Sequence, residues 1–95
     1  MAATIPKVRV AIPGELRSLC GGSAEVCLAA RDVRELLARL ASEHPQVHVR
    51  LCDERGEPRP HINVFVNDDF CPRARLDTPL SASDLVTILP AVSGG

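Results

Sequence analysis

The residues whose types best suit a chemical role stand at the end of the sequence, Ser93-Gly94-Gly95. Side chains become small after Pro90, and glycine lets a backbone pass close to other atoms and adopt φ and ψ values that larger residues rarely adopt. Such a segment suits threading into the active site of another protein, with the Gly95 carboxylate as the reactive group. Taken alone, it also fits an incidental flexible terminus or a remnant of an expression tag.

The histidines and cysteines form no catalytic or metal-binding pattern. The three histidines lack an evident Ser or Cys partner, and the four cysteines contain no CxxC pair. We expect surface or capping histidines, reduced thiols and no metal site. These residues are His44, His48, His61, Cys20, Cys27, Cys52 and Cys71.

Motifs of the common enzyme classes are also absent. The sequence has no P-loop, no dinucleotide-binding glycine motif, no zinc-protease HExxH and no nucleophile elbow. The acidic pair Asp68-Asp69 fits a turn between strands, and the arginines of residues 50–75 fit a solvated surface. The sequence therefore predicts a protein that is not an enzyme and binds no cofactor of its own.

Charge and composition exclude several kinds of partner. Eleven basic and 12 acidic residues give a net charge of −1, and Phe65 and Phe70 are the only aromatic residues, so we expect no nucleic-acid partner. No segment approaches the roughly 20 apolar residues of a membrane span, so we expect no membrane partner. Residues 1–6 lack the apolar run of a secretory signal, which predicts a cytoplasmic protein.

The first half of the chain predicts a hairpin followed by a helix. Residues 7–12 and 24–28 each alternate in hydrophobicity, as half-buried strands do, and Pro13-Gly14 separates them. Asp32 and Glu35 stand where a helix N-terminus needs them, before apolar residues at helical spacing. We expect this helix to end at Pro45.

The second half predicts further strands. Residues 46–51 fit either a short strand or a helical turn, and residues 53–60 are expected to form an exposed loop. Residues 62–66 and 70–71 predict a hairpin, and residues 85–89 predict a last strand.

This order of elements predicts an α+β fold, with one main helix packed on a mixed sheet. A β-grasp fold satisfies it, with the first and last strands as parallel neighbours at the centre. We expect a single domain over residues 1–95 with a tail from about residue 91. The predicted core is Val8, Val10, Val26, Leu28, Leu36, Leu40, Val64, Val66, Val86 and Ile88.

The last eleven residues, from Leu85 to Gly95, resemble the C-terminus of the MoaD/ThiS-type ubiquitin-like sulfur carriers. Residues 62–68 resemble the strand and turn that these carriers place before their last segments, and the helix from Val33 falls where theirs does. Thus the resemblance covers nearly the whole chain. The ending from Pro90 onward, together with the long loop from Asp53, looks closest to the carriers of bacterial cysteine biosynthesis.

The resemblance implies a function for Gly95. A ubiquitin-activating-type adenylyltransferase would adenylate it with ATP and magnesium, and a sulfur donor would then displace AMP to leave a thiocarboxylate. A sulfur-accepting biosynthetic enzyme would use that sulfur for cysteine, molybdopterin, thiamine or a sulfur-containing natural product. Ser93 and Gly94 would thread into the partner. Docking would use the tail and an exposed apolar sheet face, for which strand alternation and tail position indicate Phe65, Leu89 and Val92.

Two alternatives stay open. In the first, the chain is a ubiquitin-like modifier that becomes conjugated to lysines through Gly95. In the second, it is a non-catalytic β-grasp interaction module whose glycines are incidental.

Overall fold

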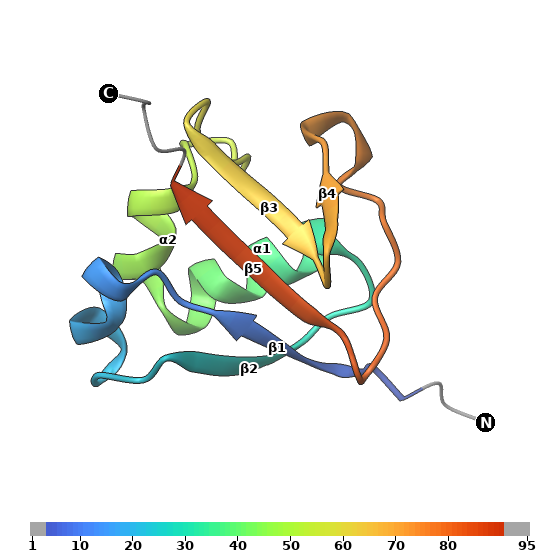
Figure 1. The fold of residues 1–95 in the computed structure, drawn as a ribbon, viewed down its shortest axis with the longest axis horizontal. Helices are drawn as coiled ribbons and strands as arrows, with labels where there is room; N and C mark the ends of the chain where they lie inside the picture. Colours follow the sequence, from blue (N-terminus) through green and yellow to red (C-terminus); the bar gives the residue numbers. More distant parts are fainter. Residues whose placement is uncertain (1–3, 91–95) are drawn as a thin grey trace.

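The computed structural model describes residues 4–90, which form a five-stranded mixed sheet with helices on one face (Figure 1). The strand order is β2-β1-β5-β3-β4. The strands are β1 (Lys7–Ala11), β2 (Glu25–Ala29), β3 (Ile62–Val66), β4 (Asp69–Cys71) and β5 (Leu85–Pro90).

The first and last strands pair in parallel inside the sheet. Val10 lies opposite Val86 in this ladder, and both side chains are fully buried. The other three pairings, β1 with β2, β3 with β4 and β3 with β5, are antiparallel. The β-grasp prediction is therefore confirmed, including the parallel neighbours that it required.

The main helix, α1 (Val33–Glu43), begins at Asp32 as predicted. The Asp32 carboxylate accepts a hydrogen bond from the backbone N–H of Glu35 at 2.8 Å, and the Glu35 carboxylate accepts one from the N–H of Arg31 at 2.7 Å. These bonds satisfy N–H groups that have no partner inside the helix. The buried residues Val33, Leu36, Leu37 and Leu40 then cover the sheet.

The ambiguous segment 46–51 is helical. It forms α2 (Pro45–Leu51), and Pro45 occupies the first turn, where a missing N–H costs nothing. Val47 and Leu51 are buried at helical spacing, whereas Val49 is 55% exposed, which a strand packed on the core would not explain. Pro45 thus ends α1 and starts a second, shorter helix beside the one main helix that we expected.

Two 3-10 helices complete the connections. They are η1 (Gly14–Cys20), which follows β1, and η2 (Arg73–Arg75), which follows β4. Residues 53–60 form a loop as predicted, although Pro58 within it is buried and bridges back to Cys52. The Asp53 carboxylate orders this loop by accepting hydrogen bonds from the N–H groups of Arg55 and Glu57.

The predicted core is confirmed with one partial exception. Nine of the ten residues are buried, and Val26 is half-buried because β2 is an edge strand. Ala24, the first residue of the predicted strand 24–28, whose alternation puts its side chain on the buried face with Val26 and Leu28, is instead exposed because the strand begins at Glu25. Residues from the helices and connections, such as Leu16, Leu51 and Leu76, extend the core beyond the predicted set.

Among residues 4–90, no helix is long and apolar enough to cross a membrane. The longest, α1, has 11 residues.

The cap of α1 gives a first prediction. Replacing Asp32 by Ala leaves the Glu35 N–H without its partner and should lower the free energy of unfolding by about 1 kcal/mol. Urea denaturation followed by circular dichroism measures this loss. Asp68→Ala, at an exposed carboxylate in the β3–β4 turn, is the matched control and should leave the midpoint nearly unchanged. Equal losses in both variants would contradict a capping role for Asp32.

Candidate functional site

The tail, residues 91–95, continues directly from β5. The predicted site residues Val92, Ser93, Gly94 and Gly95 lie outside the described residues, so the structure places their point of departure, Pro90. Pro90 lies opposite Ile62, the first residue of β3. The tail therefore departs from the edge of the sheet where β3 begins.

The sheet surface turned away from α1 and α2, which we call the open face, presents the residues that alternate with the core. On β3 and β5, Val64, Val66, Val86 and Ile88 are buried, whereas Phe65 and Thr87 are half-buried and Leu89 is 45% exposed. This alternation of buried and exposed positions is the strand period of two. The sequence therefore correctly placed Phe65 and Leu89 on the face opposite the core.

The ladder registers bring side chains from separate strands together on this face. Phe65 of β3 lies between Thr87 of β5 and Phe70 of β4, and Thr87 in turn lies opposite Ala11 of β1. Leu89 is two residues along β5 from Thr87, opposite Asn63. Side chains in directly opposed and diagonal positions on one face are close enough to touch.

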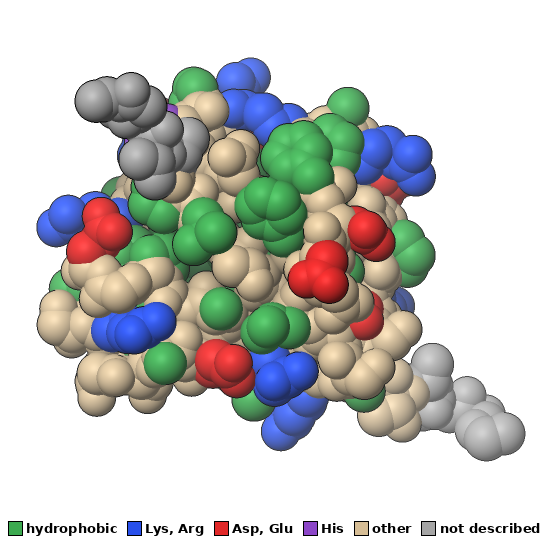
Figure 2. All heavy atoms as spheres, in the orientation of Figure 1, with side chains coloured by type: hydrophobic (Ala, Val, Ile, Leu, Met, Phe, Trp, Pro, Cys, Tyr) green, Lys and Arg blue, Asp and Glu red, His purple; other side chains and the backbone are tan. Residues whose placement is uncertain are grey.

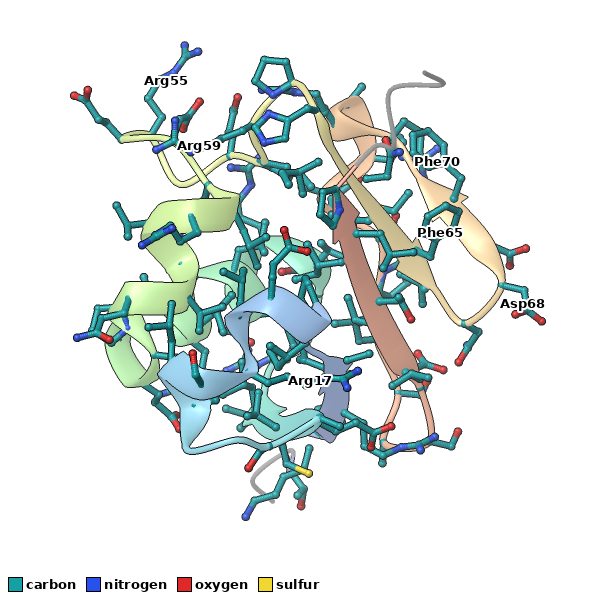
Figure 3. All side chains as sticks on the ribbon, turned by 60° about the vertical axis from the view of Figure 1, so that its left-hand side comes forward. Arg17, Arg55, Arg59, Phe65, Asp68 and Phe70 are labelled. Carbon is teal, nitrogen blue, oxygen red and sulfur yellow. The ribbon has the colours of Figure 1, made fainter. Side chains whose placement is uncertain are left out.

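Phe65 and Phe70 form an aromatic pair. Their ring centroids are 5.8 Å apart with the planes at 65°, an edge-to-face arrangement (Figure 3). Phe70 is 56% exposed, the largest exposed fraction among the large hydrophobic side chains described. The sequence predicts the hairpin, but Phe70 is not among the predicted site residues. The two-residue connection Asn67-Asp68 fixes the register that pairs it with Phe65, and that signal could have identified it.

The aromatic pair borders a shallow hollow of about 320 Å³, lined by Phe65, Asn67, Asp68, Thr87 and Leu89. Asn67 adopts φ of 55°, and its side chain bonds the Asp84 carboxylate and the Leu85 N–H at 3.0 Å each. These bonds hold the turn against the start of β5.

Figure 2 shows hydrophobic side chains gathered over β5, β3 and β4 on this face. Polar groups surround the face, including the ion pair of Arg9 and Glu25 at 3.8 Å.

The cysteines differ in exposure and are all free. Cys27 is exposed on β2, whereas Cys52 and Cys71 are buried. Burial raises the pKa of Cys52 to about 11, with the Asp53 charge acting in the same direction. The Cys71 thiol donates to the carbonyl oxygen of Arg75 at 3.4 Å. Within residues 4–90, no group of three or more His, Cys, Asp or Glu side chains could hold a metal ion.

His48 is half-buried on α2. Its Nε2 atom is buried and has no hydrogen-bond partner among the described residues. Burial lowers the pKa of His48, and the charge of Asp53 opposes this in part. The side chain therefore belongs to the packing of α2, and it lies on the helical layer instead of the open face.

Comparison with known proteins identifies the family. The sequence model of the ThiS family matches residues 10–95, which include the whole of β5 and the ending Ser93-Gly94-Gly95. The chain belongs to the ThiS family. This match confirms the resemblance on which the sequence analysis relied.

Relatives of this ThiS-family chain are similar over nearly their full length. The protein named sulfur carrier protein CysO from Mycobacterium tuberculosis is 34% identical over 91 residues, covering 93% of this chain and 98% of the relative. Among solved structures, CysO in the Amycolatopsis orientalis BexX/CysO complex is 37% identical with a TM-score of 0.79, covering 93% and 99%. Small archaeal modifier protein 1 from Methanosarcina acetivorans is 30% identical with a TM-score of 0.77, covering 98% and 100%.

Thiol exposure gives the second prediction. Iodoacetamide at pH 8 should modify Cys27 rapidly, whereas Cys52 should react only in denaturant, since its thiol is buried and its thiolate disfavoured. Peptide mass mapping over time follows each site. Cys27→Ser should remove the fast phase. Rapid labelling of Cys52 in the folded protein would contradict the packing of α2 described here.

His48 gives the third prediction. Because its pKa is lower when folded than the ordinary 6.5, the unfolded chain binds the proton more readily as the pH falls. Above pH 6.5, His48 is neutral in both states and does not lower the free energy of unfolding. Below pH 6.5, the unfolded chain takes up the proton more readily, so the free energy of unfolding decreases. Urea midpoints at pH 7.5 and pH 5 should differ less in His48→Gln than in the wild type. His61→Gln, at an exposed histidine, should keep the full difference, and an equal change in both variants would contradict the assignment.

Proposed function

We propose that this chain is a sulfur carrier whose Gly95 carboxylate is converted into a thiocarboxylate. The observation that carries the proposal is the ThiS-family match, which runs through β5 to the ending Ser93-Gly94-Gly95. The relatives named sulfur carrier protein CysO support it over nearly their whole length. In this proposal the carrier performs no catalysis, and ATP and magnesium belong to its partner.

The chemistry requires activation because a carboxylate is a poor electrophile. A ubiquitin-activating-type adenylyltransferase joins a Gly95 oxygen to the α-phosphate of ATP and releases pyrophosphate. Hydrosulfide supplied by a sulfur donor then attacks the acyl carbon, a C–S bond forms, the C–O bond to phosphate breaks, AMP leaves and the S–H proton is lost to solvent. The resulting thiocarboxylate is a soft nucleophile that a sulfur-accepting biosynthetic enzyme consumes. Among the possible acceptor enzymes, the resemblance favours one that forms cysteine. The activated form must end at Gly95, since a further residue would remove the free carboxylate.

Glycines at positions 94 and 95 suit this reaction for a steric reason. A channel that excludes water around the acyl adenylate has little room for side chains, and Gly94 lets the backbone take whatever conformation the channel imposes. Ser93 adds only a hydroxymethyl group. We assign Ser93 and Gly94 to threading and Gly95 to the covalent chemistry.

We assign docking to the open face. Phe65 and Leu89 contact the partner there, Phe70 joins them as an exposed aromatic anchor, and Val92 extends the contact along the tail. The support is the cluster of half-buried and exposed apolar side chains on the strands that lead to the tail. Because the partner also holds the tail, the open face stays close to the partner surface. This high local concentration strengthens a weak contact between the two surfaces. The protein acts in the cytoplasm in this proposal.

A second function is favoured by one relative. Small archaeal modifier protein 1 from Methanosarcina acetivorans, by its name a protein modifier, is 30% identical to this chain. In that case a lysine amine, instead of sulfur, would displace AMP from Gly95. Cell extracts would then contain conjugates of higher mass that disappear in a chain lacking Gly95.

Intact-mass spectrometry tests the carrier function. After incubation with ATP, the cognate activating enzyme and a sulfur donor, the wild type should gain the mass of one oxygen replaced by one sulfur. A variant extended by one alanine beyond Gly95 should gain nothing, because its reactive position has become an internal amide. An unchanged wild-type mass with an enzyme that is active on another carrier would contradict the proposal.

Docking on the open face gives a separate prediction. Phe70→Ala should raise the KM for the carrier in the activation reaction about tenfold without changing kcat, because an exposed aromatic anchor commonly contributes more than about 1 kcal/mol to binding. Val49→Ala, at a similarly exposed apolar side chain on α2, is the control and should keep the wild-type KM. Equal KM values for both variants would show that the enzyme does not dock on the open face through Phe70.

A further inference from the structure

A groove of about 340 Å³ lies at the point from which the tail departs, and we call it the tail-root groove. Its apolar lining comes from Leu16 of η1, Leu51 of α2, Ile62 of β3 and Pro90 of β5. Two exposed groups of opposite charge also line it, Glu15 on η1 and Arg50 on α2, and so does the exposed His61 from the connection before β3. Neither of the two charged groups has an ion-pair partner among the described residues.

Neighbouring arginines differ from Arg50 in this respect. Arg59 donates twice to the carbonyl of Val49, and Arg17 donates to the carbonyl of Ile12, so both are held by the backbone. Figure 3 shows Arg59 beside the loop and Arg17 on η1. Arg50 therefore stands out at the groove as a planar cation available to a carboxylate, which it can bind with two parallel hydrogen bonds.

The length of the tail requires that a partner come close to this groove. Five residues beyond Pro90 span at most about 17 Å when fully extended. Resting on the proposed function, the Gly95 carboxylate must reach the adenylation site, so the rim of that site lies within this distance of Pro90. A partner surface so close to Pro90 meets Glu15 and Arg50, which belong to the same groove.

We infer that the tail-root groove is a second docking site for the activating enzyme, which inserts an apolar side chain flanked by a carboxylate facing Arg50 and a cation facing Glu15. The apolar lining accepts the side chain, and the two opposite charges fix its direction. Together with the open face, two separated contacts prevent the carrier from rotating about its tail, so Gly95 enters the active site in one orientation. This is a positioning role, since neither charged residue touches the reacting atoms.

A charge exchange tests the inference. The double variant Glu15→Arg with Arg50→Glu keeps the net charge of the chain, so any effect reports local pairing instead of long-range attraction. We expect the KM for the carrier in ATP-dependent activation to rise about tenfold, with kcat unchanged, and the salt dependence of kcat/KM to decrease. Arg50→Lys should keep most of the affinity. The double variant Arg34→Glu with Glu43→Arg, at exposed residues of α1, also keeps the net charge; it is the control and should keep the wild-type KM. Thermal midpoints identify any variant that fails to fold.

Three results would overturn the inference. If the exchanged variant keeps both the wild-type KM and kcat, the enzyme does not use the groove. If its KM is lower, the chain's own tail occupies the groove and competes with the enzyme. A lower kcat at unchanged KM means that the charges act on the tail itself. The wild-type reaction separates the two proposals: if the wild type acquires sulfur and the exchanged variant behaves identically, only the groove inference fails. If the wild type acquires no sulfur, both fail.

Discussion

The parallel pairing of β1 with β5 is the constraint on which the rest of the structure depends. Val10 and Val86 face each other inside the sheet with no exposed surface, so the pairing is protected on the helical side by the core. Parallel strands end at the same edge of a sheet. Because β1 leads into η1 and β5 leads into the tail, η1 and the departure of the tail must lie side by side. The antiparallel β3 begins at that edge too, opposite Pro90. Thus one pairing assembles the tail-root groove from segments that are far apart in the sequence.

The same strands also separate the core from the open face, which we propose as the docking surface. A β-strand presents successive side chains to opposite faces, so Ile88 is buried while its neighbour Leu89 is exposed, and Val64 is buried beside half-buried Phe65. A shift of β5 by one residue would exchange these faces and place Thr87 and Leu89 in the core. The buried valines and isoleucines of β3 and β5 therefore determine which residues the open face presents. In the proposed function, the core and the docking contact use alternate positions of the same two strands.

Much of the fold could be predicted from the sequence because its signals are local. Asp32 and Glu35 mark a helix start that hydrogen bonds confirm, and the alternation of residues 7–12 gives both a strand and its buried face. The segment 46–51 could not be assigned because Val47, Val49 and Leu51 alternate as in a strand over only a brief run, whereas Val47 and Leu51 alone also fit a helix. Contact with α1 and η1 decides for a helix. The exposed position of Phe70 beside Phe65 was not predicted because it depends on register across a three-residue strand. The groove could not be foreseen because it joins four separate elements and the connection before β3.

In the proposed function, sulfur is carried by Gly95 and by none of the four cysteines. Exposed Cys27 is the natural competitor, because an accessible thiol can also acquire sulfur as a persulfide. Fragment-ion mass spectrometry of the protein after incubation with ATP, activating enzyme and sulfur donor locates the added sulfur directly. We predict that it lies on the C-terminal peptide, survives treatment with a thiol reductant and persists in Cys27→Ser. Sulfur found on a cysteine-containing peptide and removed by the reductant would contradict the account.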